Sequence, residues 1–122
     1  MPMPFFHTLI RTHHITSRKK VAHLRKAADQ LSCYALLRTG GSPGLMYCKG
    51  SEEAVREWVS TVQRLRYMDF RLLQRPVVIE TMTTQPDEKS GLVEVETVKE
   101  FAAAMEQRKL TSWWKTAMEW AS

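Results

Sequence analysis

Positively charged side chains gather in the first part of this sequence, and the chemistry they offer is the binding of anions. Arg18, Lys19 and Lys20 follow Ser17, a residue type that commonly begins a helix. The free N–H groups and the dipole of a helix start favour an anion, so this triplet is suited to hold a phosphate. A solvated helix start is an equally simple interpretation of the triplet alone. Further cations on expected strands or their ends are Arg11, Arg38, Lys49 and Arg71.

Charge is divided unevenly along the 122 residues. Residues 1–75 contain 13 Lys and Arg against 5 Asp and Glu, whereas residues 76–122 contain 5 against 8. The first part therefore has a net charge of +8 and the second of −3, which gives +5 for the chain. Net charge steers association but does not choose a fold. The asymmetry favours a polyanionic partner at the basic part, with a solvated basic surface as the alternative.

Aromatic residues on the expected strands could add base stacking. Tyr34, Tyr47 and Phe70 belong to such strands, and exposed rings of this kind stack on the bases of single-stranded RNA. Packing in the core is the more ordinary fate of these residues. The segment GLMYCKG has only Tyr47 where the third strand of an RRM carries several aromatic residues, so an RRM is rejected.

The adjacent His13 and His14 are the first candidates for a metal site. Neighbouring residues on a strand point to opposite faces, so the pair is not expected to form a chelate. We expect one histidine to pack under the helix start and the other to face solvent or a phosphate.

Motifs for catalysis and metal binding are missing from the sequence. Cys33 and Cys48 lie in different expected strands without zinc-ligand spacing, and neither HExxH nor GxSxG occurs. The glycine-rich segment 40–44 is not followed by Gly-Lys-Ser/Thr, which favours a hairpin turn over a phosphate cradle. We therefore expect no catalytic residue, no metal and no cofactor.

Two cysteines favour a reducing compartment, the nucleus or the cytoplasm. No membrane span is expected, because no apolar run approaches the roughly 20 residues required.

Hydrophobic periodicity and turn residues divide the chain into strands and helices. Leu24, Trp58, Val62 and Leu65 recur at helical spacing and are expected to pack on a sheet. The expected elements are a strand over 6–15, a helix capped by Ser17 up to Leu31, strands over 33–37 and 45–48, a helix capped by Ser51 up to Leu65, one or two strands over 70–79 broken or placed at an edge by Pro76, a short strand over 92–95, a helix capped by Thr97 and a last helical segment with Trp113, Trp114 and Trp120.

The order strand, helix, strand, strand, helix, strand is that of the split βαβ, or ferredoxin-like, fold. We therefore expect one α+β domain over 1–122, with both helices on one face of an antiparallel sheet. Its core spans about 6–80, a loop spans 81–91 and a helical extension spans 92–122. The sequence leaves open whether this extension covers the other face of the sheet. Trp113 and Trp114 lie about 100° apart on a helix, so at least one tail tryptophan should be partly exposed or in an intermolecular contact.

A family resemblance rests on four short segments within residues 7–75. They are His13-His14-Ile15, then Ser17-Arg18-Lys19-Lys20, then Gly41-Ser42-Pro43-Gly44 before a strand ending in Lys49-Gly50, and finally Arg64-Leu65-Arg66-Tyr67. With these segments the chain resembles the C-terminal domain family of the spliceosomal pre-mRNA-processing factor three, which also occurs after RWD domains. The resemblance implies a ferredoxin-like fold and, for the splicing factor, binding to small nuclear RNA.

Two function hypotheses of different classes follow, with an enzyme as a distant third. The first is a non-catalytic RNA-binding module of the small nuclear RNA type. The second is a protein-interaction domain that binds a partner or a second copy through the sheet face or through Trp113, Trp114 and Trp120. The two hypotheses differ in their salt dependence, because only binding through phosphates weakens steeply as the salt concentration rises. The residues expected to bind nucleic acid are Arg11, His14, Arg18, Lys19, Lys20, Arg38, Tyr47, Lys49 and Arg71.

Overall fold

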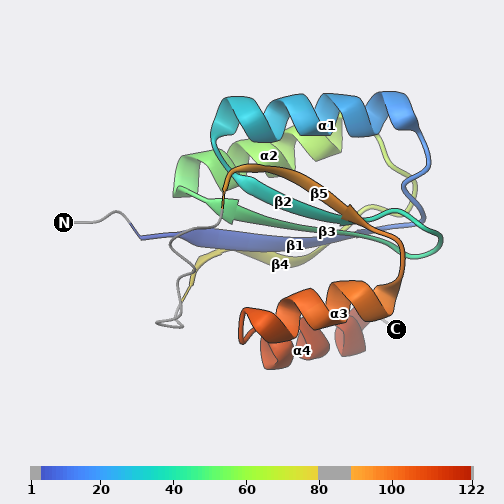
Figure 1. Ribbon diagram of the computed structural model, residues 1–122, viewed down its shortest axis with the longest axis vertical. Helices are drawn as coiled ribbons and strands as arrows, with labels where there is room; N and C mark the ends of the chain where they lie inside the picture. Colours follow the sequence, from blue (N-terminus) through green and yellow to red (C-terminus); the bar gives the residue numbers. More distant parts are fainter. Residues whose placement is uncertain (1–3, 80–88, 122) are drawn as a thin grey trace.

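A computed structural model describes residues 4–79 and 89–121, and the side chains of all of these except 120 and 121. The described chain forms a five-stranded sheet in the order β4-β1-β3-β2-β5, with two helices on each face (Figure 1). In chain order the elements are β1 (Phe6–Thr12), α1 (Arg18–Leu31), β2 (Tyr34–Arg38), β3 (Gly44–Gly50), α2 (Glu52–Arg64), β4 (Arg71–Val78), β5 (Gly91–Val95), α3 (Val98–Gln107) and α4 (Thr111–Ala121).

The first six elements confirm the expected ferredoxin-like order, and α1 and α2 lie together on one face of the sheet. β1 pairs antiparallel with β3 and β4, and β3 pairs antiparallel with β2. The expectation of a wholly antiparallel sheet is wrong, because β5 pairs in parallel with β2 from Tyr34↔Gly91 to Arg38↔Val95. Residues 92–95 therefore belong to the sheet and not to the helical extension. Of the expected loop over 81–91, residues 81–88 lie outside the described residues.

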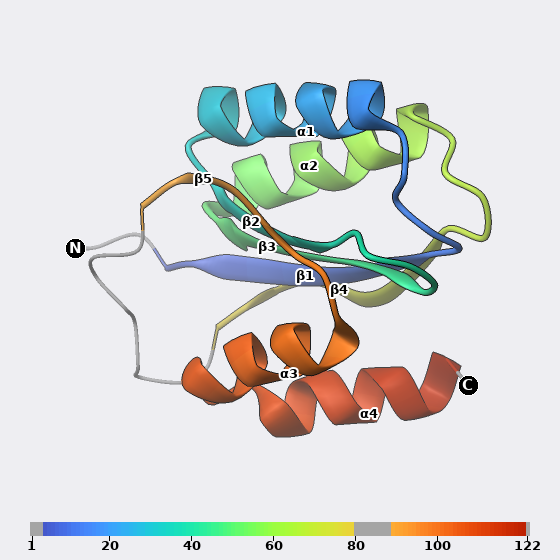
Figure 2. The ribbon, with the colours of Figure 1, turned by 45° about the vertical axis from the view of Figure 1, so that its right-hand side comes forward.

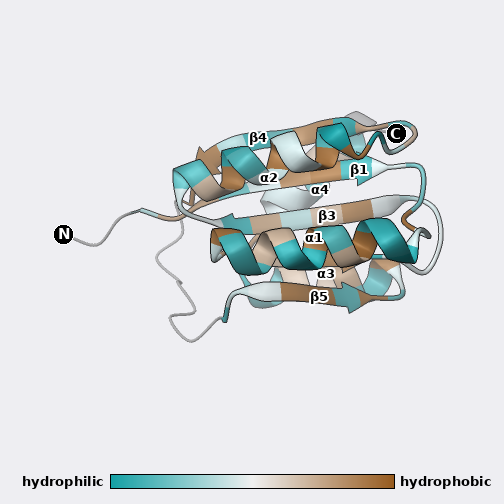
Figure 3. Cartoon of the chain, turned by 90° about the horizontal axis from the view of Figure 1, so that it is seen from above, coloured by the Kyte–Doolittle hydropathy of each residue, from teal (hydrophilic) through white to brown (hydrophobic). Residues whose placement is uncertain are grey.

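Local capping explains where the helices begin. The Ser17 hydroxyl accepts a hydrogen bond from the N–H of Lys20 at 3.2 Å, and Ser51 caps α2 in the same way. Thr97 and Glu100 form a reciprocal capping box at the start of α3. All three expected caps are confirmed. α1 carries both hydrophilic and hydrophobic residues (Figure 3), and its buried residues Val21, Leu24, Ala27 and Ala28 recur at the spacing of an amphipathic helix.

The core between the sheet and the first helix pair follows the predicted stripes. Leu24, Trp58 and Val62 are fully buried there, and Leu65 packs against them half-buried. The expected edge position of the proline-containing strand is also confirmed, since β4 lies at one side of the described sheet.

A second core lies on the opposite face of the sheet, under α3 and α4 (Figure 2). Leu9, Leu36 and Leu45 of the strands meet Phe101 and Trp114 of these helices, and all five are buried. The C-terminal helices therefore cover the face that the sequence left open. No broad sheet surface remains for stacking bases in the described part of the molecule.

Candidate functional site

Three of the predicted binding residues lie in one row across the end of the sheet. Arg71 of β4 is opposite Arg11 of β1, and Arg11 is opposite Leu45 of β3. Leu45 is in turn opposite Arg38 of β2. Cross-strand partners share a face of a sheet, and Leu45 belongs to the core under α3 and α4, so all three arginines lie on that side. β1 ends one residue after Arg11 and β4 begins at Arg71, which places the row at the rim.

The start of α1 lies at this same end of the sheet, because only a short connection separates it from the end of β1 (Figure 2). Lys19 is exposed there, and the Lys20 ammonium nitrogen lies 4.8 Å from the centroid of the Tyr67 ring. We call the seven predicted residues gathered at this end the basic end. They are Arg11, His14, Arg18, Lys19, Lys20, Arg38 and Arg71.

Two predicted residues do not belong to the basic end. Lys49 lies near the other end of β3, opposite His7 and Tyr34, with its nitrogen 5.3 Å from the Phe5 ring centroid. Tyr47 is fully buried under α3 and α4, so its assignment as a base-stacking residue is wrong. The reason is the covering of this face by the C-terminal helices.

The two histidines also differ from their expected arrangement. β1 ends at Thr12, because the His13 N–H leaves the sheet and donates to the carbonyl of Met68 at 2.8 Å. The His13 and His14 rings lie 4.8 Å apart, both exposed, and His13 Nδ1 is 3.6 Å from the Asp69 carboxylate. The expectation that they point to opposite faces is therefore wrong, and only the exposed position of His14 fits its predicted role.

Arg18 and Arg38 of the basic end bind to named groups of the chain itself. Arg18 donates to both carboxylate oxygens of Glu94 on β5, at 2.8 and 2.9 Å, and Arg25 adds a third bond at 3.0 Å. Hydrogen bonds from Arg18 hold the pKa of Glu94 below its ordinary value. Arg38 donates to the carbonyls of Glu96 and Pro43 at 2.9 and 3.1 Å. Neither guanidinium is therefore fully available to an external anion.

The remaining cations define the accessible part of the site. Within residues 4–79 and 89–119, the side chains of Lys19, Arg66 and Arg71 make no hydrogen bond or ion pair, and all three are exposed. Arg66, in the connection between α2 and β4, was missed as a site residue, although it belongs to the basic first part of the sequence. Among the described residues, no group of three or more His, Cys, Asp or Glu could hold a metal ion.

A second candidate site is a cleft of about 680 Å³ between β4 and the start of α4, which we call the His7 cleft. His7 of β1 lies at its floor, only 3 % exposed, with Nδ1 3.1 Å from the Tyr47 hydroxyl. Burial, aided by the nearby charge of Lys49, lowers the pKa of His7 to about 4. Sequence reasoning missed His7, although its two-residue spacing from Leu9 places it on the face under α4.

The tail tryptophans have separate environments. Trp114 is buried against Phe101, whereas Trp113 is half-buried and stacks on His7. Trp113 confirms the expectation that at least one of them is partly exposed. The side chain of Trp120 lies outside the described residues.

Comparison with known proteins yields a likeness of fold. No family model matches the chain, and no curated protein matches it. A solved structure described as "BlrP1 BLUF" is similar with a TM-score of 0.59 and 16% identity, over 79% of this chain and 67% of that one. This likeness shows the fold. The chain is an α+β protein of ferredoxin-like architecture. In the described part, no helix has the length and apolar character of a membrane span.

Proposed function

We propose that this chain is a non-catalytic module that binds RNA through its phosphates at the basic end. The observation that carries the proposal is that Arg71, Lys19 and Arg66 are exposed at one end of the sheet and that their side chains make no hydrogen bond or ion pair with a described residue. Exposed cations without a partner leave this end of the molecule positive. A phosphate bound there offsets that charge and gains charge-assisted hydrogen bonds.

Because the C-terminal helices cover the sheet face, they limit which parts of an RNA such a module can contact. Because Tyr47 is buried, base stacking on the sheet contributes nothing, and affinity comes from contacts with the backbone. Such contacts carry little sequence information, so RNAs of different sequence should bind alike. The choice of RNA, and of the small nuclear class within it, is supported by the net charge of the first part and by the family resemblance. The free, buried Cys33 and Cys48 fit a reducing compartment, the nucleus or the cytoplasm.

Glu94 acts in this proposal as an internal anion. Its carboxylate receives the Arg18 fork in the bidentate geometry that a phosphate also accepts. Arg18 therefore adds to the positive field but does not contact the RNA directly. Lys19, Lys20, Arg66 and Arg71 make the contacts.

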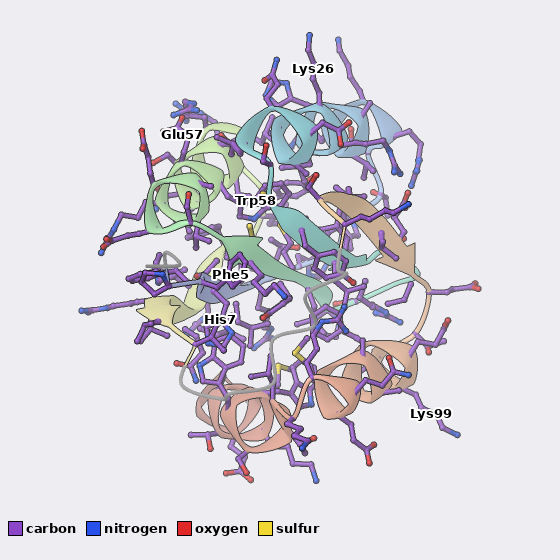
Figure 4. The ribbon with its side chains drawn as sticks, turned by 60° about the vertical axis from the view of Figure 1, so that its left-hand side comes forward. Phe5, His7, Lys26, Glu57, Trp58 and Lys99 are labelled. Carbon is purple, nitrogen blue, oxygen red and sulfur yellow. The ribbon has the colours of Figure 1, made fainter. Side chains whose placement is uncertain are left out.

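The proposal is tested by fluorescence anisotropy with two labelled single-stranded RNAs of unrelated sequence. Lys19→Ala combined with Arg71→Ala should weaken both RNAs by about tenfold or more at low salt, because two phosphate contacts are lost. The matched control is Lys26→Ala combined with Lys99→Ala, whose side chains project away from the body on α1 and α3 (Figure 4). Absence of binding at high micromolar protein, or an equal loss in the control, contradicts the proposal.

One observation favours protein interaction as the second candidate. Val77 and Val78 are 40% and 38% exposed on the edge strand β4, and Phe5 beside it is 44% exposed. An open edge strand with apolar side chains can pair with another chain. Sedimentation velocity tests this candidate for a second copy of the chain. Association that grows with protein concentration and persists at high salt supports self-association through β4, and a monomer at every concentration contradicts self-association.

A further inference from the structure

We propose that the His7 cleft binds a small planar acid, that is, a flat aromatic ring system carrying one anionic group. The cleft lies between β4 and the turn that joins α3 to α4, and it is separate from the basic end. Its volume of about 680 Å³ falls within the range of small-molecule sites. Leu73, Val77 and Leu110 supply apolar wall, which suits an aromatic ring.

The floor of the cleft offers one polar atom that the fold leaves unused. His7 lies between the sheet and the C-terminal helices (Figure 4), and its Nδ1 is engaged with the Tyr47 hydroxyl. Its Nε2 makes no hydrogen bond with any described residue. His7 is neutral near pH 7 because burial lowers its pKa. When the Tyr47 hydroxyl donates to Nδ1, the hydrogen of the neutral ring lies on Nε2, which is then a donor for the ligand.

Trp113 provides a flat aromatic wall beside this donor. His7 covers one face of the indole at a centroid distance of 4.0 Å, and Trp113 still lines the cleft half-buried. Gln74 holds the start of α4 in place by donating from its side-chain amide to the Trp113 carbonyl at 3.1 Å. The wall is therefore fixed to β4 before any ligand arrives, which lowers the entropic cost of binding.

The charge of the rim selects an acid. Arg75 of β4 and Lys109 of the turn line the cleft from its two sides, and both are exposed. Neither side chain has a hydrogen-bond or ion-pair partner among the described residues, and no described lining residue is acidic. Arg75 can hold a carboxylate or phosphate through two parallel hydrogen bonds. A ligand with an anionic group at the rim and an aromatic ring against Trp113 contacts both the cationic rim and the aromatic wall of the cleft.

The test is an NMR titration of the full chain with 2-naphthoate and with 2-naphthamide, its uncharged counterpart. We expect 2-naphthoate to shift the resonances of His7, Gln74, Lys109 and Trp113 and to bind with a Kd below about 1 mM, a weak affinity typical of small unoptimised ligands. The amide should bind at least about fivefold more weakly, because it lacks the charge that Arg75 and Lys109 pair with. Equal binding of acid and amide, no binding at millimolar concentration, or shifts confined to other surfaces would overturn the proposal.

Surface variants keep the test independent of folding. Arg75→Ala and Lys109→Ala should each weaken the binding of 2-naphthoate by about threefold or more. Lys99→Ala removes the same single positive charge from α3, away from the cleft, and should leave this affinity unchanged. His7→Phe keeps an aromatic ring at the floor and removes Nε2, so it should weaken 6-hydroxy-2-naphthoate, whose hydroxyl oxygen can accept a hydrogen bond there, more than it weakens 2-naphthoate. Equal affinity for 2-naphthoate in Arg75→Ala, Lys109→Ala and Lys99→Ala contradicts the proposal. RNA binding should be the same in Lys109→Ala as in the parent chain, because the basic end is a separate site.

Discussion

His7 and Trp113 stack face to face, with 4.0 Å between their ring centroids and 9° between their planes. The two residues come from the first strand and the last helix, so the contact ties α4 to the sheet. The hydrogen bond between His7 Nδ1 and the Tyr47 hydroxyl fixes the imidazole from the other direction. The attachment of the C-terminal helices therefore includes a titratable group that must stay neutral.

Stability should depend on the protonation of His7. Its pKa is about 4 in the folded chain and 6.5 in the ordinary state, so between these values the unfolded chain binds more protons. Stability is therefore fully present above about pH 6.5 and falls as the pH drops toward 4, by at most about 3 kcal/mol.

Urea unfolding at pH 7 and at pH 4.5, for the parent chain and for His7→Phe, measures this contribution. Carboxylates titrate in the same range, so the quantity of interest is the difference between the two proteins. The parent should lose more free energy of unfolding than His7→Phe on acidification. Equal losses would show that His7 is not held neutral by the fold.

Trp58 should be the most costly single residue of the first core. It is fully buried, and its indole Nε1 has no hydrogen-bond partner among the described residues. Trp58→Ala should lower the free energy of unfolding by about 3–5 kcal/mol. Trp58→Phe should cost clearly less, because it keeps an aromatic ring and removes an unpaired donor. A loss below about 1 kcal/mol for the alanine variant would contradict the burial of Trp58.

Gly40 should be required where the β2–β3 turn meets the end of β5. A Cβ at Gly40 would collide with the backbone carbonyl of Glu96, which Arg38 also contacts. Gly40→Ala should therefore cost about 1–3 kcal/mol. Gly41→Ala is the matched control, since its Cβ would meet only the flexible guanidinium end of Arg38, at 3.3 Å. Thermal unfolding should show a clearly larger loss at Gly40, and equal losses would contradict the packing described.

Neutralising Glu94 should strengthen RNA binding. Glu94→Gln removes the carboxylate that holds Arg18 and Arg25. It frees the Arg18 guanidinium for phosphate, whereas Arg25 keeps its hydrogen bond to the Leu92 carbonyl. Glu96→Gln is the control, because it removes the same charge nearby without releasing either arginine. Anisotropy should show a gain in affinity for Glu94→Gln that exceeds the gain for Glu96→Gln. Equal gains would assign the effect to net charge alone.

Hydrophobic periodicity and helix caps predicted the ferredoxin-like part of the fold, because these patterns depend on residues close together in the sequence. The stripe through Trp58 and Val62 and the caps at Ser17 and Ser51 depend on residues within a few turns of each other. The pairing of β5 with β2 has no such local signal. It depends on backbone groups at the edge of β2, which any extended segment of suitable length can satisfy.

The candidate site was predicted in composition but not in detail. The fold brings seven of the nine predicted residues to one end, yet Arg18 is bound to Glu94, 76 positions away. The periodicity of the sequence gives no information on a contact between residues so far apart along the chain. Tyr47 was misassigned although Leu45-Met46-Tyr47-Cys48 is apolar throughout, a pattern that indicates a strand buried on both faces.

The salt dependence of RNA binding tests the central claim most directly. The dissociation constant of a single-stranded RNA is measured over a range of KCl for the parent chain, for Lys19→Ala with Arg71→Ala, and for Lys26→Ala with Lys99→Ala. Each lost phosphate contact should lower the slope of log Kd against log salt by about 0.7, so the first variant should lose roughly 1.4 and the second nothing. A slope that is the same in all three proteins, or a parent chain whose affinity does not change with salt, would contradict phosphate binding at the basic end.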